Sequence, residues 1–438
     1  AFSIYGDDER VALLRILAQS EHLDDIDIER FSRRIAACLH AQPDATLPES
    51  LASKGAREEE VQLAIQYERH MRWARAIDEA GLGQAVRRAI EDQPFEERWP
   101  IVAIDDAQHV TPALFAGLQP LLSSRVFTMA VCRATRLRPP GAEGWDVATT
   151  AERDLECTTV HLSSIKRGTP GIQSVVRSSI DEEAEPGADG TNPPILLAAL
   201  SARDERRWIA NRVSAHVDDG TSPDRCAVLC TDASVLRAVT EGLEEAEIPY
   251  QELKTPSIAG PPALLIDYLR AIANPHDPVA LFRIMNEPAR GIGQATRQNL
   301  VDEAVTAGCS VWERIRPGGS PLKLPGGRGP YVNRFAEQMA EWRRMAPTLT
   351  GPELVRRLTE DLDLTEERVK SYTAETLARH EALQGLTKAL AGYPATPLAL
   401  RDRLGAFIAA NDVGTGVVVR RIEDTTGRQF ECVVVAGA

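Results

Sequence analysis

Short apolar runs alternate with helical segments in two parts of the chain, and this alternation restricts the fold more than any other feature. In the first part, the apolar run 101–104 is followed by an acidic loop and then by a helix that Thr111-Pro112 opens. In the second part, the apolar run 226–230 precedes a helix over 233–246. Strands that alternate with helices form parallel sheets, so both parts predict an α/β fold.

Long helical stretches flank these α/β parts. Apolar spacing predicts a helix over 10–19, a long amphipathic run over 59–89 and a largely helical region from 261 to 410. Further strands are expected at 126–132, 158–162, 195–199, 416–422 and 431–435. Because the last helical region lies between β-rich segments, we expect an α/β domain that a helical insertion interrupts.

Charge and cysteine content exclude several classes of protein. The 438 residues carry 64 acidic and 50 basic side chains, a net charge of -14, which argues against coating DNA through bulk charge but allows local basic faces. No stretch has the length of a membrane helix and Asp7 and Asp8 replace a basic signal start, so we expect a cytoplasmic protein. Cys226 and Cys230 share one strand face, which favours core packing over a zinc site.

Residues 101–109 read Ile-Val-Ala-Ile-Asp-Asp-Ala-Gln-His. A carboxylate at the end of a buried strand lies where phosphoryl chemistry occurs in α/β sheets, and it is a ligand that Mg²⁺ prefers. We therefore expect Asp105 to hold Mg²⁺, Asp106 to orient an attacking water and Gln108 to sense the γ-phosphate of ATP. The alternative is a strand that ends in a polar turn without a catalytic role.

The same segment resembles the Walker B box of superfamily 1 helicases of the UvrD, PcrA and Rep type, which reads Asp-Glu-x-Gln-Asp after four apolar residues. Asp105 and Gln108 match this box, whereas Asp106 stands in place of the catalytic Glu and His109 in place of Asp. The resemblance implies an α/β chain with two RecA-like P-loop NTPase lobes, each built on a parallel sheet and carrying a helical insertion subdomain. Both lobes are expected to be incomplete here, with Ala1 marking a truncation.

The resemblance extends over nearly the whole chain. The segment 76–82 lies where the family has Asp-Phe-Asp-Asp-Leu and keeps Asp78 and Leu82, and the segment 268–293 resembles the opening of the accessory subdomain almost residue for residue. The implied parts are a helical insertion of the first lobe (1–75), the C-terminal part of the first RecA-like lobe (76–190), a first segment of the second lobe (191–257), a helical accessory subdomain (258–410) and a truncated second segment of the second lobe (411–438).

Three groups of residues are candidates for binding nucleic acid or nucleotide. We expect Gly291, Ile292 and Gly293 to form a turn whose N–H groups face a duplex phosphate, although a turn that only caps a helix fits the local sequence equally well. Arg133 and Arg136 are expected to line a groove for a DNA strand. By resemblance, Arg167 contacts the γ-phosphate of ATP; the alternative is an arginine paired on the surface at a helix start.

Other family signatures are missing or altered. No segment matches the Gly-x-x-Gly-x-Gly-Lys-Thr phosphate loop, and Ala134, Pro140, Glu423 and Thr426 stand where the family has Gln, Arg, His and Lys. The first hypothesis is an ATP- and Mg²⁺-dependent 3′-to-5′ DNA helicase that acts on single-stranded DNA and on single-strand/duplex junctions in repair or recombination. The second is an inactive helicase-like scaffold that binds DNA or a nuclease or repair partner. We expect no ATP hydrolysis by this chain alone.

Overall fold

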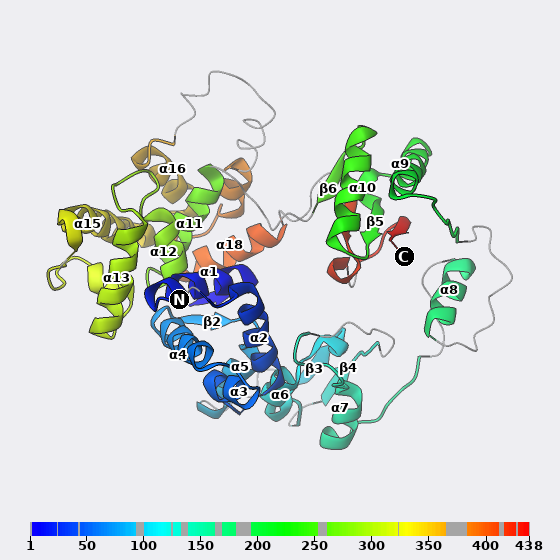
Figure 1. Cartoon of the computed structure of the whole chain (residues 1–438), viewed down its shortest axis with the longest axis horizontal. Helices are drawn as coiled ribbons and strands as arrows, with labels where there is room; N and C mark the ends of the chain where they lie inside the picture. Colours follow the sequence, from blue (N-terminus) through cyan, green and yellow to red (C-terminus); the bar gives the residue numbers. More distant parts are fainter. Residues whose placement is uncertain are drawn as a thin grey trace. The chain divides into compact units, whose positions relative to one another are not determined.

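The chain folds into two compact units, which are described separately (Figure 1). The first comprises residues 1–133, 138–156 and 257–409, and the second comprises 134–137, 157–256 and 410–438. The computed structural model describes residues 2–23, 25–42, 44–92, 100–123, 126–132, 139–162, 169–180, 194–252, 261–322, 324–364, 383–410, 416–425 and 428–437.

The first unit begins with a helical insertion between two paired strands. Strand β1 (Ser3–Tyr5) pairs in parallel with β2 (Ala76–Asp78), and the residues between them form α1 (Asp7–Ser20), α2 (Ile28–Ala41), α3 (Leu47–Ser53) and α4 (Glu58–Trp73). Side-chain caps fix two of the helix starts: Asp27 accepts a hydrogen bond from the Arg30 N–H, and Thr46 and Glu49 form a capping box. The core of the insertion is apolar and includes Leu13, Phe31, Ile35 and Leu63.

The predicted continuous helical run over 59–89 is wrong. Helix α4 ends at Trp73, Arg75 adopts a positive φ of 49°, and β2 precedes a separate helix, α5 (Leu82–Asp92). The helix is interrupted because β2 pairs with β1, with Ser3 aligned to Ala76. Strand β1 lies more than seventy residues earlier in the sequence. The spacing of apolar residues within one segment does not predict pairing with a strand that is distant in sequence.

The candidate nucleotide site lies on a second pair of parallel strands in the same unit. Strand β3 (Ile101–Ile104) pairs in parallel with β4 (Val126–Met129). Helix α6 (Pro112–Ser123) connects the two strands along the chain, and α7 (Val147–Leu155) follows β4. Helix α5 packs closely on α6 because both contribute a glycine: a Cβ on Gly117 would lie 2.4 Å from the Gly83 carbonyl oxygen. The predicted strand at 158–162 is wrong, since these residues pair with no strand in the described part of the chain.

In the described residues of 261–410, the regular structure of the accessory block is helical, as the apolar spacing predicts. The helices are α11 (Pro261–Ala273), α12 (Pro278–Ile284), α13 (Gln294–Ala307), α14 (Val311–Ile315), α15 (Gly329–Met345), α16 (Gly351–Asp361) and α18 (Pro397–Ala410). Trp342 anchors their core: it stacks edge-on against Tyr268 at 5.4 Å and donates a 2.8 Å hydrogen bond to Asp361. Figure 1 shows α11, α12 and α13 beside α1 of the insertion, and α12 contributes Val279 to the insertion core.

The second unit contains a four-stranded parallel sheet in the order β6-β7-β5-β8. Its elements are α8 (Pro170–Ile180), α9 (Ala202–Asp218), β5 (Cys226–Cys230), α10 (Ala233–Glu245), β6 (Tyr250–Glu252), β7 (Val417–Arg421) and β8 (Cys432–Ala436). The strands predicted at 226–230, 416–422 and 431–435 are confirmed, but the strand at 195–199 is wrong, and Leu196 there is 98% exposed. Cys226 and Cys230 are buried in the core, where burial raises the pKa of each thiol to about 11.

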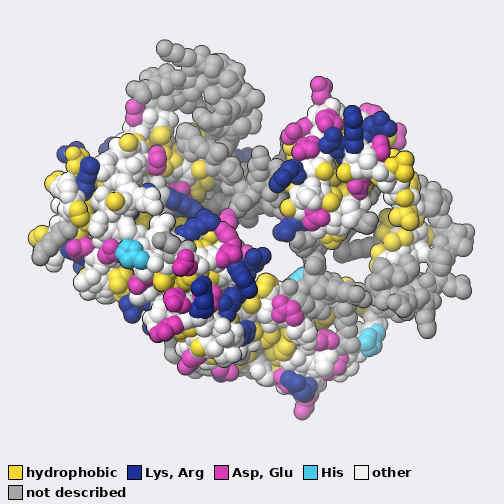
Figure 2. All heavy atoms as spheres, in the orientation of Figure 1, with side chains coloured by type: hydrophobic (Ala, Val, Ile, Leu, Met, Phe, Trp, Pro, Cys, Tyr) yellow, Lys and Arg dark blue, Asp and Glu magenta, His cyan; other side chains and the backbone are white. Residues whose placement is uncertain are grey.

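Both units therefore combine helices with parallel strands, which is the predicted mixed α/β class. Among the residues that the structure describes, no helix combines the length and the apolar character that crossing a bilayer requires. The surface in Figure 2 mixes acidic and basic side chains over both units.

Candidate nucleotide site and nucleic-acid interface

An acidic turn follows β3 at its carboxyl end. Asp105 and Asp106 are both exposed, and Asp106 adopts a left-handed conformation with φ of 49°, which aspartate tolerates better than most residues. The turn is held against β4 by backbone bonds, because the Ala130 N–H donates to the Ile104 carbonyl and the Ala107 N–H donates to the Ala130 carbonyl, each at 2.9 Å. Two carboxylates are thus presented to solvent from a fixed backbone.

Gln108 lies beneath this turn and is only 3% exposed. Its amide nitrogen donates a 2.9 Å hydrogen bond to Asp106 Oδ1, and its amide oxygen accepts one of 2.9 Å from the Cys132 N–H. The structure therefore brings Asp106 and Gln108 together, with Asp105 next to them through a 3.0 Å bond from the Asp106 N–H. Both ends of the Gln108 amide are used within the chain, so it braces the turn.

The donor set of the acidic turn fits Mg²⁺. This ion commonly binds proteins through one or two carboxylates and keeps several waters, and Asp105 and Asp106 supply two exposed carboxylates at the end of a parallel strand. No cluster of three or more His, Cys, Asp or Glu side chains suited to a metal occurs in the described ranges. A bound Mg²⁺ would therefore complete its shell with water and phosphate oxygens.

Several predicted site residues cannot be placed beside the acidic turn. Arg133, Arg136 and Arg167 lie outside the described residues, as do Ala134 and Thr426.

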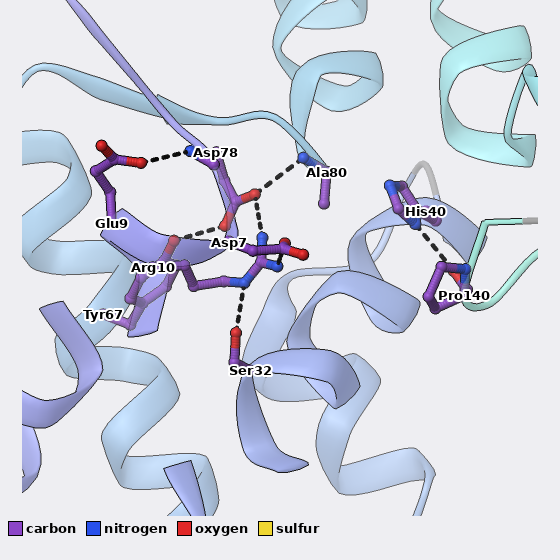
Figure 3. Close-up of polar contacts among 10 residues, drawn as sticks. Asp7, Glu9, Arg10, Ser32, His40, Tyr67, Asp78, Ala80 and Pro140 are labelled. Atoms are coloured by element: carbon purple, nitrogen blue, oxygen red, sulfur yellow. Dashed lines mark hydrogen bonds and ion pairs between the residues drawn. The ribbon is translucent and has the colours of Figure 1, made fainter. Parts of the chain in front are cut away.

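Pro140, which stands at the position of a family arginine, lies against the helical insertion. Its carbonyl accepts a 2.9 Å hydrogen bond from His40 Nδ1 on α2 (Figure 3). The next residue, Gly141, has a φ of 86°, and a Cβ there would lie 2.1 Å from the Ala37 carbonyl oxygen. Only glycine fits this contact. The segment therefore has a packing role in this chain.

The Gly291–Gly293 turn is rigid. Gly291 has a φ of 74°, and the Ile292 side chain is fully buried in the accessory core. Asn286 Oδ1 accepts hydrogen bonds of 3.0 Å from the Arg290 and Ile292 N–H groups, so one side chain fixes the backbone on both sides of Gly291. The space beside Gly293 is open, since a Cβ there would meet no atom within 4 Å.

Two arginines flank this turn, but only one of them is free to meet a ligand. The Arg290 guanidinium donates to the Ile284, Glu287 and Pro288 carbonyls and to the Tyr268 hydroxyl. Its hydrogen-bonding capacity is therefore used inside the accessory block.

Arg328, from the Gly/Pro-rich loop before α15, is the free arginine. Its Nη1 would lie 3.4 Å from a Cβ on Gly291, and its guanidinium lies 5.7 Å from the centre of the Tyr331 ring. Within the described ranges it makes no ion pair. Sequence reasoning missed Arg328, because only its position in a glycine-rich loop marked it.

Asp78, the aspartate that the chain shares with the family in this segment, is 6% exposed and lies in a polar network (Figure 3). It accepts hydrogen bonds from Arg10 Nη1 at 2.8 Å, from the Tyr67 hydroxyl at 2.6 Å and from the Ala80 N–H at 2.9 Å. Arg10, itself 2% exposed, also donates to Ser32 at 2.9 Å and pairs with Asp7. Asp78 thus joins α1, α4 and β2.

The stability of the insertion should depend on pH through His70. Burial lowers the pKa of His70, although its Nδ1 lies 2.9 Å from the Gln66 carbonyl, to which it donates. An unfolded histidine takes up its proton near pH 6.5 while the buried one stays neutral, so the free energy of unfolding should decrease as pH falls below about 6.5.

Urea unfolding of the chain and of His70→Gln, each at about pH 7.5 and about pH 5.5, measures this dependence. The decrease should be smaller in the variant. Burial also lowers the pKa of His276, so part of the decrease should remain. Equal decreases in both proteins would exclude His70 as a source.

Parallel strand pairs combined with large helical blocks define a protein of the mixed α/β class. Its β3 strand carries two carboxylates at the carboxyl end. Within that class, residues 162–320 match the family model described as UvrD-like helicase C-terminal domain. Over these residues the chain is thus similar to the UvrD-like helicases.

Curated relatives support this relation over most of the chain. DNA helicase II of Escherichia coli (strain K12) is 26% identical over 377 residues, which cover 77% of this chain and 49% of the relative. The ATP-dependent DNA helicase PcrA of Staphylococcus epidermidis is 23% identical over 337 residues, which cover 72% and 46%. PcrA of Staphylococcus aureus is 22% identical over the same length. The chain spans about half the length of the curated relatives it matches.

Proposed function

We propose that the protein is an ATP-dependent 3′-to-5′ DNA helicase of the UvrD-like type, with two RecA-like lobes, which works in the cytoplasm in repair or recombination. Its substrates are single-stranded DNA and single-strand/duplex junctions. The observation that carries this proposal is the rigid Gly291–Gly293 turn with the unpaired Arg328 beside it. Backbone N–H groups and a guanidinium are both donors to phosphate oxygens.

The acidic turn supplies the nucleotide half of the proposal. Asp105 would hold Mg²⁺, which when bound neutralises charge on the phosphates of ATP. Asp106 would position the attacking water, and Gln108 would keep its carboxylate aligned through the bond to Oδ1. Arg167 would contact the γ-phosphate, and Arg133 and Arg136 would line the path of the DNA strand.

Arg328→Ala should weaken binding of duplex DNA about tenfold, because a hydrogen bond from a charged donor to a phosphate is lost. The slope of log affinity against log salt concentration should fall by about 0.9, as expected for one phosphate contact. Fluorescence anisotropy of a labelled duplex measures both quantities. Arg356→Ala is the matched control, since Arg356 is paired with Glu360 on α16. An unchanged slope in Arg328→Ala would contradict a phosphate contact at this turn.

A second candidate function is a non-hydrolysing scaffold that binds DNA or a nuclease or repair partner. It is favoured by Asp106 in place of the catalytic glutamate and by the docking of Pro140 on α2. A DNA-stimulated ATPase assay on the full-length gene product decides between the two. Turnover that disappears in Asp105→Ala supports the helicase, whereas no turnover with intact DNA binding supports the scaffold.

A further inference from the structure

Four basic side chains lie around the turn between α11 and α12. We call Arg75, His276, Arg316 and Arg343 the basic cluster. They come from four different elements of the first unit: the turn after α4, the turn after α11, the end of α14 and helix α15. Within the described residues, Arg75 and Arg316 form no ion pair and no side-chain hydrogen bond, and both are exposed.

Short contacts hold the centre of the basic cluster in place. The His276 ring lies 2.8 Å from the hydroxyl of Ser310, which caps α14 and is 3% exposed. Arg343 Nε donates to the Ile272 carbonyl at 3.2 Å, and its guanidinium lies 5.9 Å from the Trp312 ring. His276 and Arg343 are therefore fixed by buried partners.

Arg75 reaches the cluster from the insertion. It has a positive φ of 49°, a left-handed conformation that is strained for a residue other than glycine. Asn274 Nδ2 donates a 2.8 Å hydrogen bond to the preceding Ala74 carbonyl, and this bond fastens the Arg75 turn to the end of α11. An arginine thus occupies a position where glycine would be less strained.

Positive charge in the cluster is only partly compensated. Burial lowers the pKa of His276, and Arg75, Arg343 and Arg316 lower it further, while Glu313 alone opposes them. The Glu313 carboxylate accepts from the Ser310 N–H as part of a capping box. Burial and the charge of Arg75 also lower the pKa of Arg343. Like charges held this close favour the binding of an anion.

We propose that the basic cluster binds a phosphodiester of a DNA backbone, as a second contact apart from the Gly291–Gly293 turn. The proposal rests on the proposed function, since it assigns a further DNA contact to the same protein. Guanidinium groups match the oxygen geometry of a phosphate, and a cluster without an exposed aromatic ring would read no base. The contact is therefore expected to be independent of sequence.

The test compares DNA binding by the chain and by the double variant Arg75→Gly/Arg316→Ala. Glycine at position 75 suits the positive φ, so the turn should persist. Anisotropy of a labelled 3′-tailed duplex should show at least tenfold weaker binding and a salt slope reduced by about 1.8, the value for two phosphate contacts. The control is Arg356→Ala/Arg357→Ala, which removes the same charge from arginines paired on α16 at 2.7 and 2.9 Å.

The outcomes of this test distinguish the DNA contact at the basic cluster from the proposed helicase function. An unchanged slope in the cluster variant, or an equal loss in the control, overturns the proposal. If Arg328→Ala still weakens binding in that case, the proposed function stands. Failure of the chain itself to bind DNA overturns both. Inorganic phosphate that competes as strongly as DNA at equal phosphate concentration would identify the cluster as a site for free phosphate and would also overturn the proposal.

Discussion

Asp78→Ala is expected to lower the free energy of unfolding by about 3–5 kcal/mol, since it leaves a buried charge without its partner. Arg10 would keep Ser32 and Asp7, but Asp7 is 86% exposed and cannot replace a buried carboxylate. The Tyr67 hydroxyl and the Ala80 N–H would lose their acceptor as well. Urea unfolding followed by circular dichroism measures the change.

Two further variants provide comparisons for the loss of stability expected in Asp78→Ala. Tyr67→Phe removes one hydrogen bond to Asp78 and should cost about 1.5–3 kcal/mol, the range for a bond to a charged group. Glu360→Ala removes an exposed carboxylate from the pair with Arg356 on α16 and should cost at most about 1 kcal/mol. A loss below about 1 kcal/mol for Asp78→Ala would show that the Arg10 charge finds another partner or reaches water.

Asp277→Ala is expected to destabilise the first unit by about 2–5 kcal/mol, the sum of a helix cap and a buried hydrogen bond to a charged group. Asp277 is 1% exposed, accepts from the Tyr5 hydroxyl at 2.6 Å and caps α12 through the Val279 and Ala280 N–H groups. The variant cuts the buried link between the insertion and the accessory block. The same unfolding measurement applies.

A double-mutant cycle separates the link from the cap. Tyr5→Phe removes the hydroxyl and leaves the cap of α12 intact, so the two changes share only the Tyr5–Asp277 hydrogen bond. Their coupling energy should be at least about 1 kcal/mol, as is usual for residues in direct contact. Strictly additive effects would mean that the bond contributes nothing to joining the two blocks.

Sequence reasoning located the fold elements where the local pattern carries the cause. The strand 226–230 coincides with β5 because a short apolar run between turns is typical of a strand buried on both faces. The prediction for 59–89 is wrong because β2 forms by pairing with β1. The prediction for 195–199 is wrong because this apolar run pairs with no strand among the described residues. Pairing between distant strands is a tertiary property that local spacing does not contain.

The candidate sites divide in the same way. The adjacency of Asp105 and Asp106 at a strand end follows from the order of residues, and the structure keeps it. The position of Arg328 beside Gly291 depends on how the loop before α15 packs on the accessory block. The basic cluster likewise joins residues from positions 75 to 343, which no motif relates.

The bond between Tyr5 and Asp277 also has a consequence for synthesis on the ribosome. These residues are 272 positions apart, so at about 5–20 residues per second the Tyr5 hydroxyl waits roughly 14–54 s for its acceptor. Val279, which completes the insertion core, arrives at the same time. The insertion can therefore complete its buried contacts only after α12 of the accessory block has been synthesised.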